Sequence, residues 1–268
     1  MRCAVLGSPV RHSLSPVLHR AAYAALGLSD WSYEAIECDE SGLGGLLKEP
    51  WAGLSLTMPL KRVALTLVDT CSELALNVGG VNTVLFRDGR PHGDNTDVYG
   101  IVTALTEAGI RTPSSVLVLG GGATAASALA AVAQLGADRV TLAVRTPARV
   151  GETATVGERF GLSVTVRPLA GLRELLTADL VISTLPGDGA DPYAEMIARS
   201  GSAVFDVIYA PWPTVLGAAV QRADGTVVGG FPMLLHQAVR QVELMTGRTD
   251  VPVEAMRAAG EAELARTT

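Results

Sequence analysis

The chain has 268 residues, 18% of them charged, and a formal net charge of −6 at pH 7. That length is enough for two modest domains, each with its own core. The acidic balance and the lack of a basic stripe argue against nucleic acid as a partner. The cysteines, Cys3, Cys38 and Cys71, are three in number and lack CxxC spacing. We therefore expect a reducing, cytoplasmic location and no structural metal site.

No segment has the pattern expected of a signal peptide or a membrane span. The first apolar run is interrupted at Gly7, too early for a signal peptide. Residues 112–137 carry no charge, but Pro113 and the glycine triplet 120–122 interrupt them. We interpret that stretch as a buried strand followed by a helix, and we expect no association with a membrane.

Strand and helix patterns alternate through the first hundred residues. An apolar strand over 2–6 leads through a polar turn to a helix over 16–26. We expect Ser15 to cap this helix, with Pro16 as its first residue. Because Ser13 has no such task, it is the better ligand candidate. Further strands are expected over 31–38, 53–57 and 84–86, and short helices over 41–48 and 61–68.

Lysine is rare in this chain. There are nineteen arginines and only two lysines, Lys48 and Lys61. Arginine does not lose its proton in a protein, whereas lysine can, so a retained lysine suggests a need for an amine. Lys61 follows a strand end, where open α/β sheets bind ligands. Its charge at a helix start opposes the helix dipole, so we expect a carboxylate or an anionic ligand beside it. A solvated lysine is the alternative.

A second polar cluster lies just before the helix expected over 98–108. It follows a hairpin turn at 87–90 and spans Gly93-Asp94-Asn95-Thr96-Asp97. Asp97 can serve the helix as a cap or first-turn carboxylate, or it can take part in chemistry. The local pattern alone leaves both readings open.

Residues 115–149 have the pattern of strand, glycine turn, helix and strand. Gly120 would make the tight turn, Gly122 would let the backbone approach a pyrophosphate, and Ala125 would let the helix pack closely. The helix N-terminus, with Ala123 and Thr124, would face the phosphates with free N–H groups. The alternative is a strand–helix turn without a ligand.

The end of the second strand of this segment indicates which dinucleotide binds. NAD sites usually place an acidic residue there for the ribose hydroxyls. This chain has Val144, then Arg145 and Thr146, with Arg149 four residues beyond Arg145. Two guanidiniums and no acid suit a 2′-phosphate, so we expect NADP(H). Arg149 alone would be read as a solvated residue.

The α/β alternation continues to the end of the chain. Strands are expected over 162–166, 180–184, 203–207 and 226–228, and helices up to 160, over 172–176, over 233–245 and from 252. The fold class is therefore α/β, with a Rossmann-type doubly wound unit.

Several motifs stand in a fixed order along the chain. They are Gly7-Ser-Pro-Val-Arg-His-Ser-Leu-Ser-Pro16, Thr57-Met-Pro-Leu-Lys61, Val81-Asn82-Thr83, Asp94-Asn-Thr-Asp97, the glycine turn, Asp206-Val-Ile-Tyr209 and Gly230-Phe-Pro-Met-Leu-Leu-His-Gln237. Together they resemble the shikimate dehydrogenase family over nearly the whole chain.

The resemblance implies a two-domain organisation and a reaction. An α/β substrate domain, residues 1–99 with 233–268, would accompany an NADP-binding Rossmann domain, residues 100–232, with a cleft between them. The implied activity is the reversible NADPH-dependent reduction of 3-dehydroshikimate to shikimate, a step of aromatic amino-acid biosynthesis. We expect a cytoplasmic monomer or homodimer with a small-molecule substrate and no metal.

The resemblance also implies roles for individual residues. Lys61 and Asp97 would be the catalytic pair. The substrate-binding residues would be Ser13, Ser15, Thr57, Lys61, Asn82, Asp97, Tyr209 and Gln237. The cofactor-binding residues would be Gly120, Gly121, Gly122, Ala123, Thr124, Arg145, Thr146, Arg149, Val207 and Gly230.

Some positions depart from the family pattern without removing a catalytic group. They are Ser55 where asparagine is common, Val98 where glycine is common, Val144 where asparagine is frequent, and Ser183-Thr184-Leu185 in place of Asn-Ala-Thr. Two rival functions remain. One is a quinate or quinate/shikimate dehydrogenase, which would prefer NAD and tolerate an extra ring hydroxyl, and the other is a regulatory domain that binds NADP without turnover.

Overall fold

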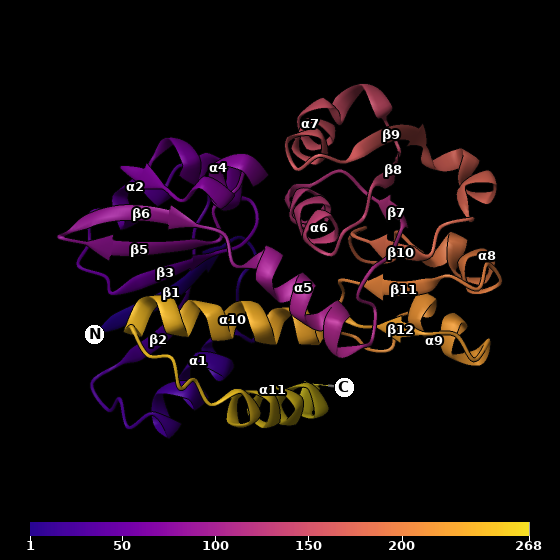
Figure 1. Ribbon diagram of the computed structural model, residues 1–268. Helices are drawn as coiled ribbons and strands as arrows, with labels where there is room; N and C mark the ends of the chain where they lie inside the picture. Colours follow the sequence, from indigo (N-terminus) through magenta and orange to yellow (C-terminus); the bar gives the residue numbers. More distant parts are fainter. Residues whose placement is uncertain (268) are drawn as a thin grey trace. The chain divides into compact units, whose positions relative to one another are not determined.

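The computed structural model describes residues 1–267, which form two compact units (Figure 1). The first unit contains Met1–Gly100 and the chain from Leu234 onward, and the second contains Ile101–Met233. The chain leaves the first unit within helix α5 (Asp97–Glu107) and returns within helix α10 (Gly230–Thr246).

The first unit is built on a mixed six-stranded sheet in the order β2-β1-β3-β5-β6-β4. Strand β1 is parallel to β2 and β3, whereas β5 is antiparallel to β3 and β6. Asp88 and Gly89, with φ of 51° and 75°, make the two-residue turn between β5 and β6. The strands are β1 (Arg2–Gly7), β2 (Ser32–Glu37), β3 (Gly53–Leu56), β4 (Thr70–Cys71), β5 (Thr83–Arg87) and β6 (Arg90–Asp94).

Helices cover this sheet, and α1 packs against α11 (Figure 1). Apolar side chains of β1, β3, β5, α2 and α3 form a buried cluster that includes Leu6, Leu54 and Leu60. The helices are α1 (Ser15–Ala25), α2 (Leu43–Leu46), α3 (Leu60–Val63), a 3-10 turn η1 (Ala64–Thr66), α4 (Glu73–Val78) and α11 (Val253–Thr267).

The second unit is a parallel six-stranded sheet in the order β12-β11-β10-β7-β8-β9. The chain starts in the middle at β7, runs outward to β9, and then returns to β10 on the other side. The strand order therefore reverses between β7 and β10, and ligands of such sheets bind at the carboxyl ends there. The strands are β7 (Ser115–Leu119), β8 (Arg139–Val144), β9 (Ser163–Pro168), β10 (Leu180–Ser183), β11 (Ala203–Asp206) and β12 (Val227–Val228).

Helices lie on both faces of the parallel sheet, α6 packing with α7 and α8 with α9 (Figure 1). Because both faces are covered, central strands such as β7 and β10 are almost entirely apolar and buried. The helices are α6 (Ala123–Gln134), α7 (Gly151–Arg159), α8 (Ala194–Ala198) and α9 (Val215–Arg222), with 3-10 turns η2 (Pro147–Arg149), η3 (Leu169–Leu175) and η4 (Asp191–Tyr193).

The structure corrects several local predictions. Ser15 does not cap α1: it is the first helical residue, Leu14 is the N-cap, and no side-chain capping bond is formed there. The hydroxyl of Ser13 instead accepts the N–H of Ser15 at 3.2 Å. The expected helix at 172–176 is a 3-10 turn that begins at Leu169, and α10 begins three residues before the predicted 233.

Helix α9 was not predicted, although it carries a clear start signal. Thr214 caps it, its Oγ1 accepting the N–H of Gly217 at 2.9 Å. Pro211 and Pro213 precede that cap, and prolines so close together are typical of turns and loops.

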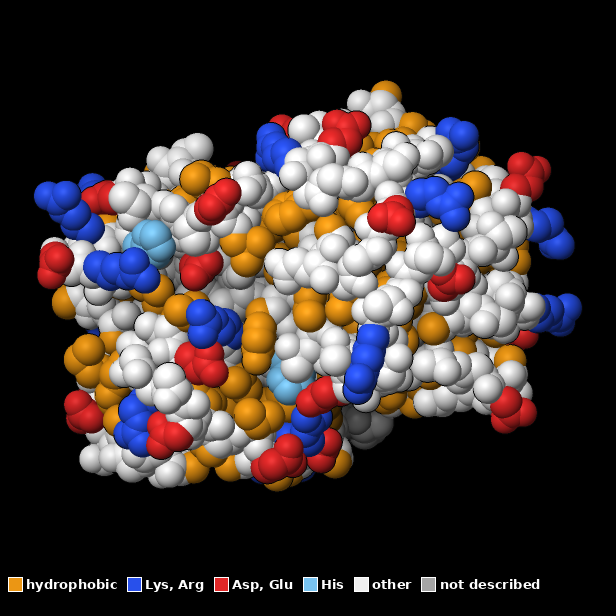
Figure 2. Space-filling view, in the orientation of Figure 1, with side chains coloured by type: hydrophobic (Ala, Val, Ile, Leu, Met, Phe, Trp, Pro, Cys, Tyr) orange, Lys and Arg blue, Asp and Glu red, His pale blue; other side chains and the backbone are white. Residues whose placement is uncertain are grey.

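Surface charge and ligating side chains are dispersed. Basic and acidic side chains are interspersed on the face shown in Figure 2, without a continuous basic band. Within residues 1–267, no helix combines the length and apolar character needed to cross a bilayer. The same part of the chain holds no cluster of three or more His, Cys, Asp or Glu side chains suited to a metal ion. All three cysteines are free thiols.

Candidate active site

The carboxylate expected beside Lys61 is Asp97. The Lys61 Nζ donates a hydrogen bond to Asp97 Oδ2 at 2.6 Å, and the two side chains are 14% and 5% exposed. Lys61 lies on α3, just after β3, and Asp97 is the first residue of α5. Because the pair is largely shielded from water, its attraction is stronger than that of an exposed pair. Asp97 is thus one of the two kinds of partner expected for Lys61, a carboxylate and not an anionic ligand.

Asp97 is a first-turn carboxylate of α5, and the capping task belongs to Asn95. The Asn95 Oδ1 accepts the backbone N–H groups of Asp97 at 3.0 Å and Val98 at 3.4 Å. The side chain of Asn95 is held in turn, because its Nδ2 donates to the carbonyl of Gly80 at 2.8 Å. Asn95 therefore accepts two of the first N–H groups of the helix, and the Asp97 carboxylate is left for Lys61 and Asn82.

Asn82 holds the other oxygen of Asp97. The Asn82 Nδ2 donates to Asp97 Oδ1 at 2.8 Å and to Thr96 Oγ1 at 3.0 Å. Its Oδ1 accepts the backbone N–H of Thr96 at 2.8 Å. A backbone N–H can only donate, so it fixes which side of the amide faces Asp97. The two oxygens of Asp97 are thus held separately, one by Asn82 and one by Lys61.

The predicted carboxylate-binding loop is tied to the loop that carries Thr57. Ser8 N–H donates to Met58 O, and Thr57 N–H to Leu6 O, both at 2.9 Å. The two loops approach so closely at Gly7 that a Cβ there would lie 2.3 Å from the Thr57 Cγ2. These loops follow β1 and β3, which are neighbouring parallel strands. Ser13 and Ser15 therefore belong to the same end of the sheet as Thr57.

The remaining two predicted substrate residues have different settings. Gln237 lies on α10, is 6% exposed, and donates from Nε2 to the carbonyl of Leu234 at 2.8 Å. Tyr209 belongs to the second unit, where it follows β11, and burial raises the pKa of its phenol. Among the predicted residues, direct side-chain hydrogen bonds join Lys61, Asn82 and Asp97.

In the second unit, the glycine turn lies where the strand order reverses. Gly120 follows β7 with φ of +106°, and a Cβ there would lie 2.4 Å from Thr184 Oγ1, just beyond β10. A Cβ on Gly121 would meet Val150 at 2.5 Å. Gly122 differs, because no atom lies within 4 Å of its Cβ position. Gly120 and Gly121 are thus required by the fold, and Gly122 leaves space before α6.

The start of α6 is suited to an anion. Gly122 is the N-cap of α6 and has no side-chain oxygen that could accept the first N–H groups of the helix. Ala123 and Thr124 lie in that first turn. Ala125 is completely buried, which brings the helix close to the sheet. Unsatisfied N–H groups and the positive end of the helix dipole favour phosphate binding.

Two arginines follow the adjacent strand β8. Arg145, Thr146 and Arg149 are exposed, and neither guanidinium has a partner within the described part of the chain. Val144, by contrast, is only 6% exposed and belongs to the core. This strand end therefore presents two free positive charges and no acid.

Val207 and Gly230, both predicted to bind cofactor, contact each other. A Cβ on Gly230 would lie 2.0 Å from the Val207 carbonyl oxygen, so only glycine fits. Asp206, just before Val207, is completely buried, and burial raises the pKa of its carboxyl. It is held by Thr214 Oγ1, which donates to its Oδ2 at 2.8 Å. Asp206 thus anchors the segment that leads to Tyr209.

The sequence analysis assigned no role to three polar residues that form hydrogen bonds here: Asn95, Thr184 and Gln241. Thr184 Oγ1 donates to the carbonyl of Leu119 at 2.8 Å, closing the turn beside Gly120. Gln241 is 1% exposed and lies one helical turn after Gln237. A second glutamine four residues along an otherwise apolar helix face was the available signal.

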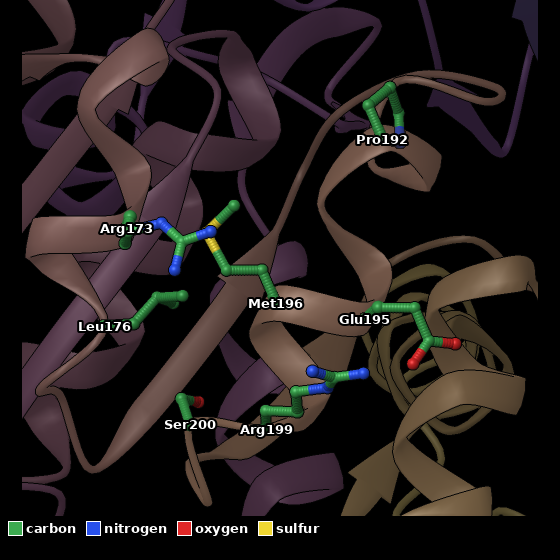
Figure 3. Close-up of a pocket in the computed structure, with 7 residues that line it drawn as sticks. All are labelled: Arg173, Leu176, Pro192, Glu195, Met196, Arg199 and Ser200. Atoms are coloured by element: carbon green, nitrogen blue, oxygen red, sulfur yellow. The ribbon is translucent and has the colours of Figure 1, made fainter.

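A separate hollow of about 470 Å³ lies in the second unit, and no predicted site residue lines it (Figure 3). Arg173 extends toward Met196, and Glu195 points away from Arg173 toward the edge of the view. Glu195 is paired with Arg222 at 2.7 Å. This open surface hollow is therefore distinct from the groups described above.

These features define a class: an α/β protein that combines a Rossmann-type unit with a unit carrying a largely shielded lysine–aspartate pair. A model of the shikimate dehydrogenase substrate binding domain matches residues 5–84, and a model of the shikimate 5'-dehydrogenase C-terminal domain matches residues 230–259. A shikimate dehydrogenase (NADP(+)) of Thermus thermophilus is 39% identical over 253 residues, which cover 92% of this chain and 93% of its own.

Two crystal structures extend the likeness to the fold. Mycobacterium tuberculosis shikimate dehydrogenase is 40% identical, with a TM-score of 0.90 over 97% of this chain and 99% of its own. A shikimate 5-dehydrogenase from Thermus thermophilus, in complex with NADP(H) and shikimate, is 33% identical, with a TM-score of 0.84 over 98% and 99%. The chain belongs to the shikimate dehydrogenase family.

Proposed function

We propose that this chain catalyses the reversible NADPH-dependent reduction of 3-dehydroshikimate to shikimate, with Lys61 and Asp97 as its catalytic pair. As a member of its family, it is an NADP-dependent oxidoreductase of the shikimate pathway. The observation that supports the residue assignment is the shielded Lys61–Asp97 pair, joined at 2.6 Å.

The chemistry needs a proton donor beside the ketone oxygen. Bound NADPH would supply the hydride to the ketone carbon, and negative charge would then build on the oxygen. Lys61 donates the proton in reduction and accepts it in oxidation. Asp97 holds the amine through its Oδ2, while Asn82 holds the other carboxylate oxygen at 2.8 Å. The pair is therefore oriented before substrate arrives, which lowers the entropy cost of reaction.

The other polar residues fit a small polyol acid. Ser13 and Ser15 would donate hydroxyl hydrogens to the substrate carboxylate, and Thr57, Gln237 and Tyr209 would contact the ring hydroxyls. Asn82 differs, because both hydrogens of its amide are engaged by Asp97 and Thr96. A substrate hydroxyl would share one of these hydrogens, so the chief task of Asn82 is to orient Asp97.

The predicted cofactor residues fit NADP(H) by their chemistry. The open space at Gly122 and the free N–H groups at the start of α6 would receive the pyrophosphate. Arg145 and Arg149 would hold the 2′-phosphate, with Thr146 beside them, and Val207 and Gly230 would be further contacts to the cofactor. We assign residues 100–232 to the NADP domain, and 1–99 with 233–268 to the substrate domain.

A matrix of substrates and cofactors tests this function against its rivals. The absorbance at 340 nm gives kcat/KM for shikimate and quinate, each with NADP+ and NAD+. We expect shikimate with NADP+ to be the preferred combination. A preference for quinate or for NAD+ would favour a quinate dehydrogenase. Binding of NADP+ without turnover of either acid would favour a regulatory domain.

The family resemblance also motivates a cytoplasmic monomer or homodimer. The three free thiols, Cys3, Cys38 and Cys71, suit a reducing compartment. Cell fractionation tests the location, and light scattering during size-exclusion chromatography tests the oligomeric state.

A further inference from the structure

We infer that Gln241 is a positioning residue for the reaction, acting on Asp97 through Thr83 and Asn82. This inference rests on the proposed roles of Lys61 and Asp97. Gln241 lies on α10, and its Nε2 donates to Thr83 Oγ1 at 3.0 Å. Thr83 Oγ1 donates to Asn82 Oδ1 at 2.8 Å, and Asn82 Nδ2 donates to Asp97 Oδ1 at 2.8 Å.

The direction of every bond in this series follows from one backbone group. The N–H of Thr96 can only donate, so the group it faces at 2.8 Å is Asn82 Oδ1. That oxygen can only accept, so Thr83 Oγ1 donates to it. The hydroxyl hydrogen of Thr83 is then used, and the Gln241 group facing it must be the donor, Nε2. The same Nε2 lies 3.3 Å from the carbonyl oxygen of Asn82, which can only accept.

The series continues beyond Gln241 in the same direction. Because Nε2 faces Thr83, Gln241 Oε1 faces Ser55, and Ser55 Oγ donates to it at 2.8 Å. Ser55 then accepts the hydroxyl hydrogen of Tyr33 at 2.6 Å. The Tyr33 ring is held by His19, which stacks on it with ring centroids 3.9 Å apart. Every donor from Tyr33 onward therefore points toward Asp97.

All members of the series are buried. The exposed fraction is 4% or less for each of Tyr33, Ser55, Gln241, Thr83 and Asn82. In such surroundings hydrogen bonds polarise one another, and an unmatched polar group is costly. The series therefore holds the Asn82 amide in one orientation with its N–H toward Asp97. Gln241, on helix α10, connects Thr83 at the start of β5 to Ser55 on β3.

A purely structural role would stabilise the fold without a specific effect on turnover. Measurements of kcat and KM for shikimate with NADP+ distinguish a structural role from a positioning role. The variants are Gln241→Leu, Ser55→Ala and Tyr33→Phe. The chain offers a matched control, Tyr23→Phe. Tyr23 is 2% exposed in the same unit, and its hydroxyl faces the thiol of Cys3 and forms no hydrogen bond with a member of the series.

We expect Gln241→Leu to lower kcat about tenfold, with KM for shikimate changed less than about twofold, because an oriented hydrogen bond near the reacting groups is lost. Ser55→Ala and Tyr33→Phe should lower kcat by progressively smaller factors, and Tyr23→Phe should leave it unchanged. In an Asn82→Ala background, Gln241→Leu should cause no further loss of kcat, because its effect passes through Asn82.

Three results would overturn the positioning role: unchanged kcat in Gln241→Leu, a full additional loss in the Asn82→Ala background, or equal effects of Tyr33→Phe and Tyr23→Phe. Should Gln241→Leu fail to fold, Ser55→Ala carries the same cycle with Asn82→Ala. Failure of wild-type turnover would contradict the proposed function itself. Normal wild-type turnover with an unaltered Gln241→Leu enzyme would contradict only the positioning role.

Discussion

Replacing Arg145 and Arg149 by alanine tests which dinucleotide this chain is built to bind. Both guanidiniums are exposed and lack partners within residues 1–267, so their removal breaks no internal contact. A hydrogen bond to a charged group is worth more than a neutral one, but exposure to solvent and salt reduces the gain. We expect each single substitution to raise KM for NADP+ about tenfold, and the double substitution about a hundredfold.

The same variants should bind NAD+ as the wild type does, because NAD+ lacks the 2′-phosphate. The assay is kcat/KM with NADP+ and with NAD+ at fixed shikimate. Arg139→Ala is the matched control. Arg139 is also exposed, but it lies at the opposite end of strand β8, about 20 Å from Arg145 at some 3.3 Å per residue. An unchanged KM for NADP+ in the double variant, or an equal loss with NAD+, would refute the assignment of the 2′-phosphate.

Three further predictions concern two glycines of the glycine turn and a buried histidine. Gly120→Ala should lower the free energy of unfolding by about 1–3 kcal/mol, because its φ is +106° and its Cβ would collide with Thr184. Gly122→Ala should leave the free energy of unfolding within about 0.5 kcal/mol of wild type, because no atom lies within 4 Å of the Cβ position. The same substitution should raise KM for NADP+, because the added methyl group would occupy the space before α6. A loss of stability with a normal KM would contradict the assignment of this turn to a phosphate. Burial lowers the pKa of His19 to about 4 in the folded protein. As pH falls, the unfolded chain therefore takes up a proton at this histidine before the folded protein does. The free energy of unfolding should then decrease between pH 6.5 and 4 by roughly 3 kcal/mol. Urea unfolding of His19→Phe should lose that part of the pH dependence, and an unchanged slope would show that His19 is not its source.

The parts of this protein that follow from neighbouring residues were accessible from sequence. The strand–glycine–helix pattern at residues 116–135 is local, and the structure has β7, Gly120 and α6 in that order. The expectation of a carboxylate or an anionic ligand beside Lys61 also came from a local argument, the helix dipole. The two departures from prediction, at Ser15 and at α9, also concern local features, and a proline lies close to each helix start.

Contacts between distant segments were not accessible in the same way. Gln241 reaches Thr83 across 158 positions of the chain, and no local pattern encodes that distance. The Asn82 amide donates its two hydrogens to Thr96 and Asp97, and these bonds depend on the packing of the start of β5 against the start of α5. The sequence indicated that Asn82 and Asp97 are polar residues of interest, whereas the structure shows which atom holds which.

Turnover by Lys61→Ala shows whether Lys61 transfers the proton in shikimate oxidation. With shikimate and NADP+, the absorbance at 340 nm should show kcat lower by about 10²–10⁴-fold, the usual contribution of a general acid–base group. Affinity for shikimate should change little, and Lys48→Ala, which alters the only other lysine of the chain, should behave as wild type. Turnover by Lys61→Ala at the wild-type rate would show that Lys61 is not the group that transfers the proton.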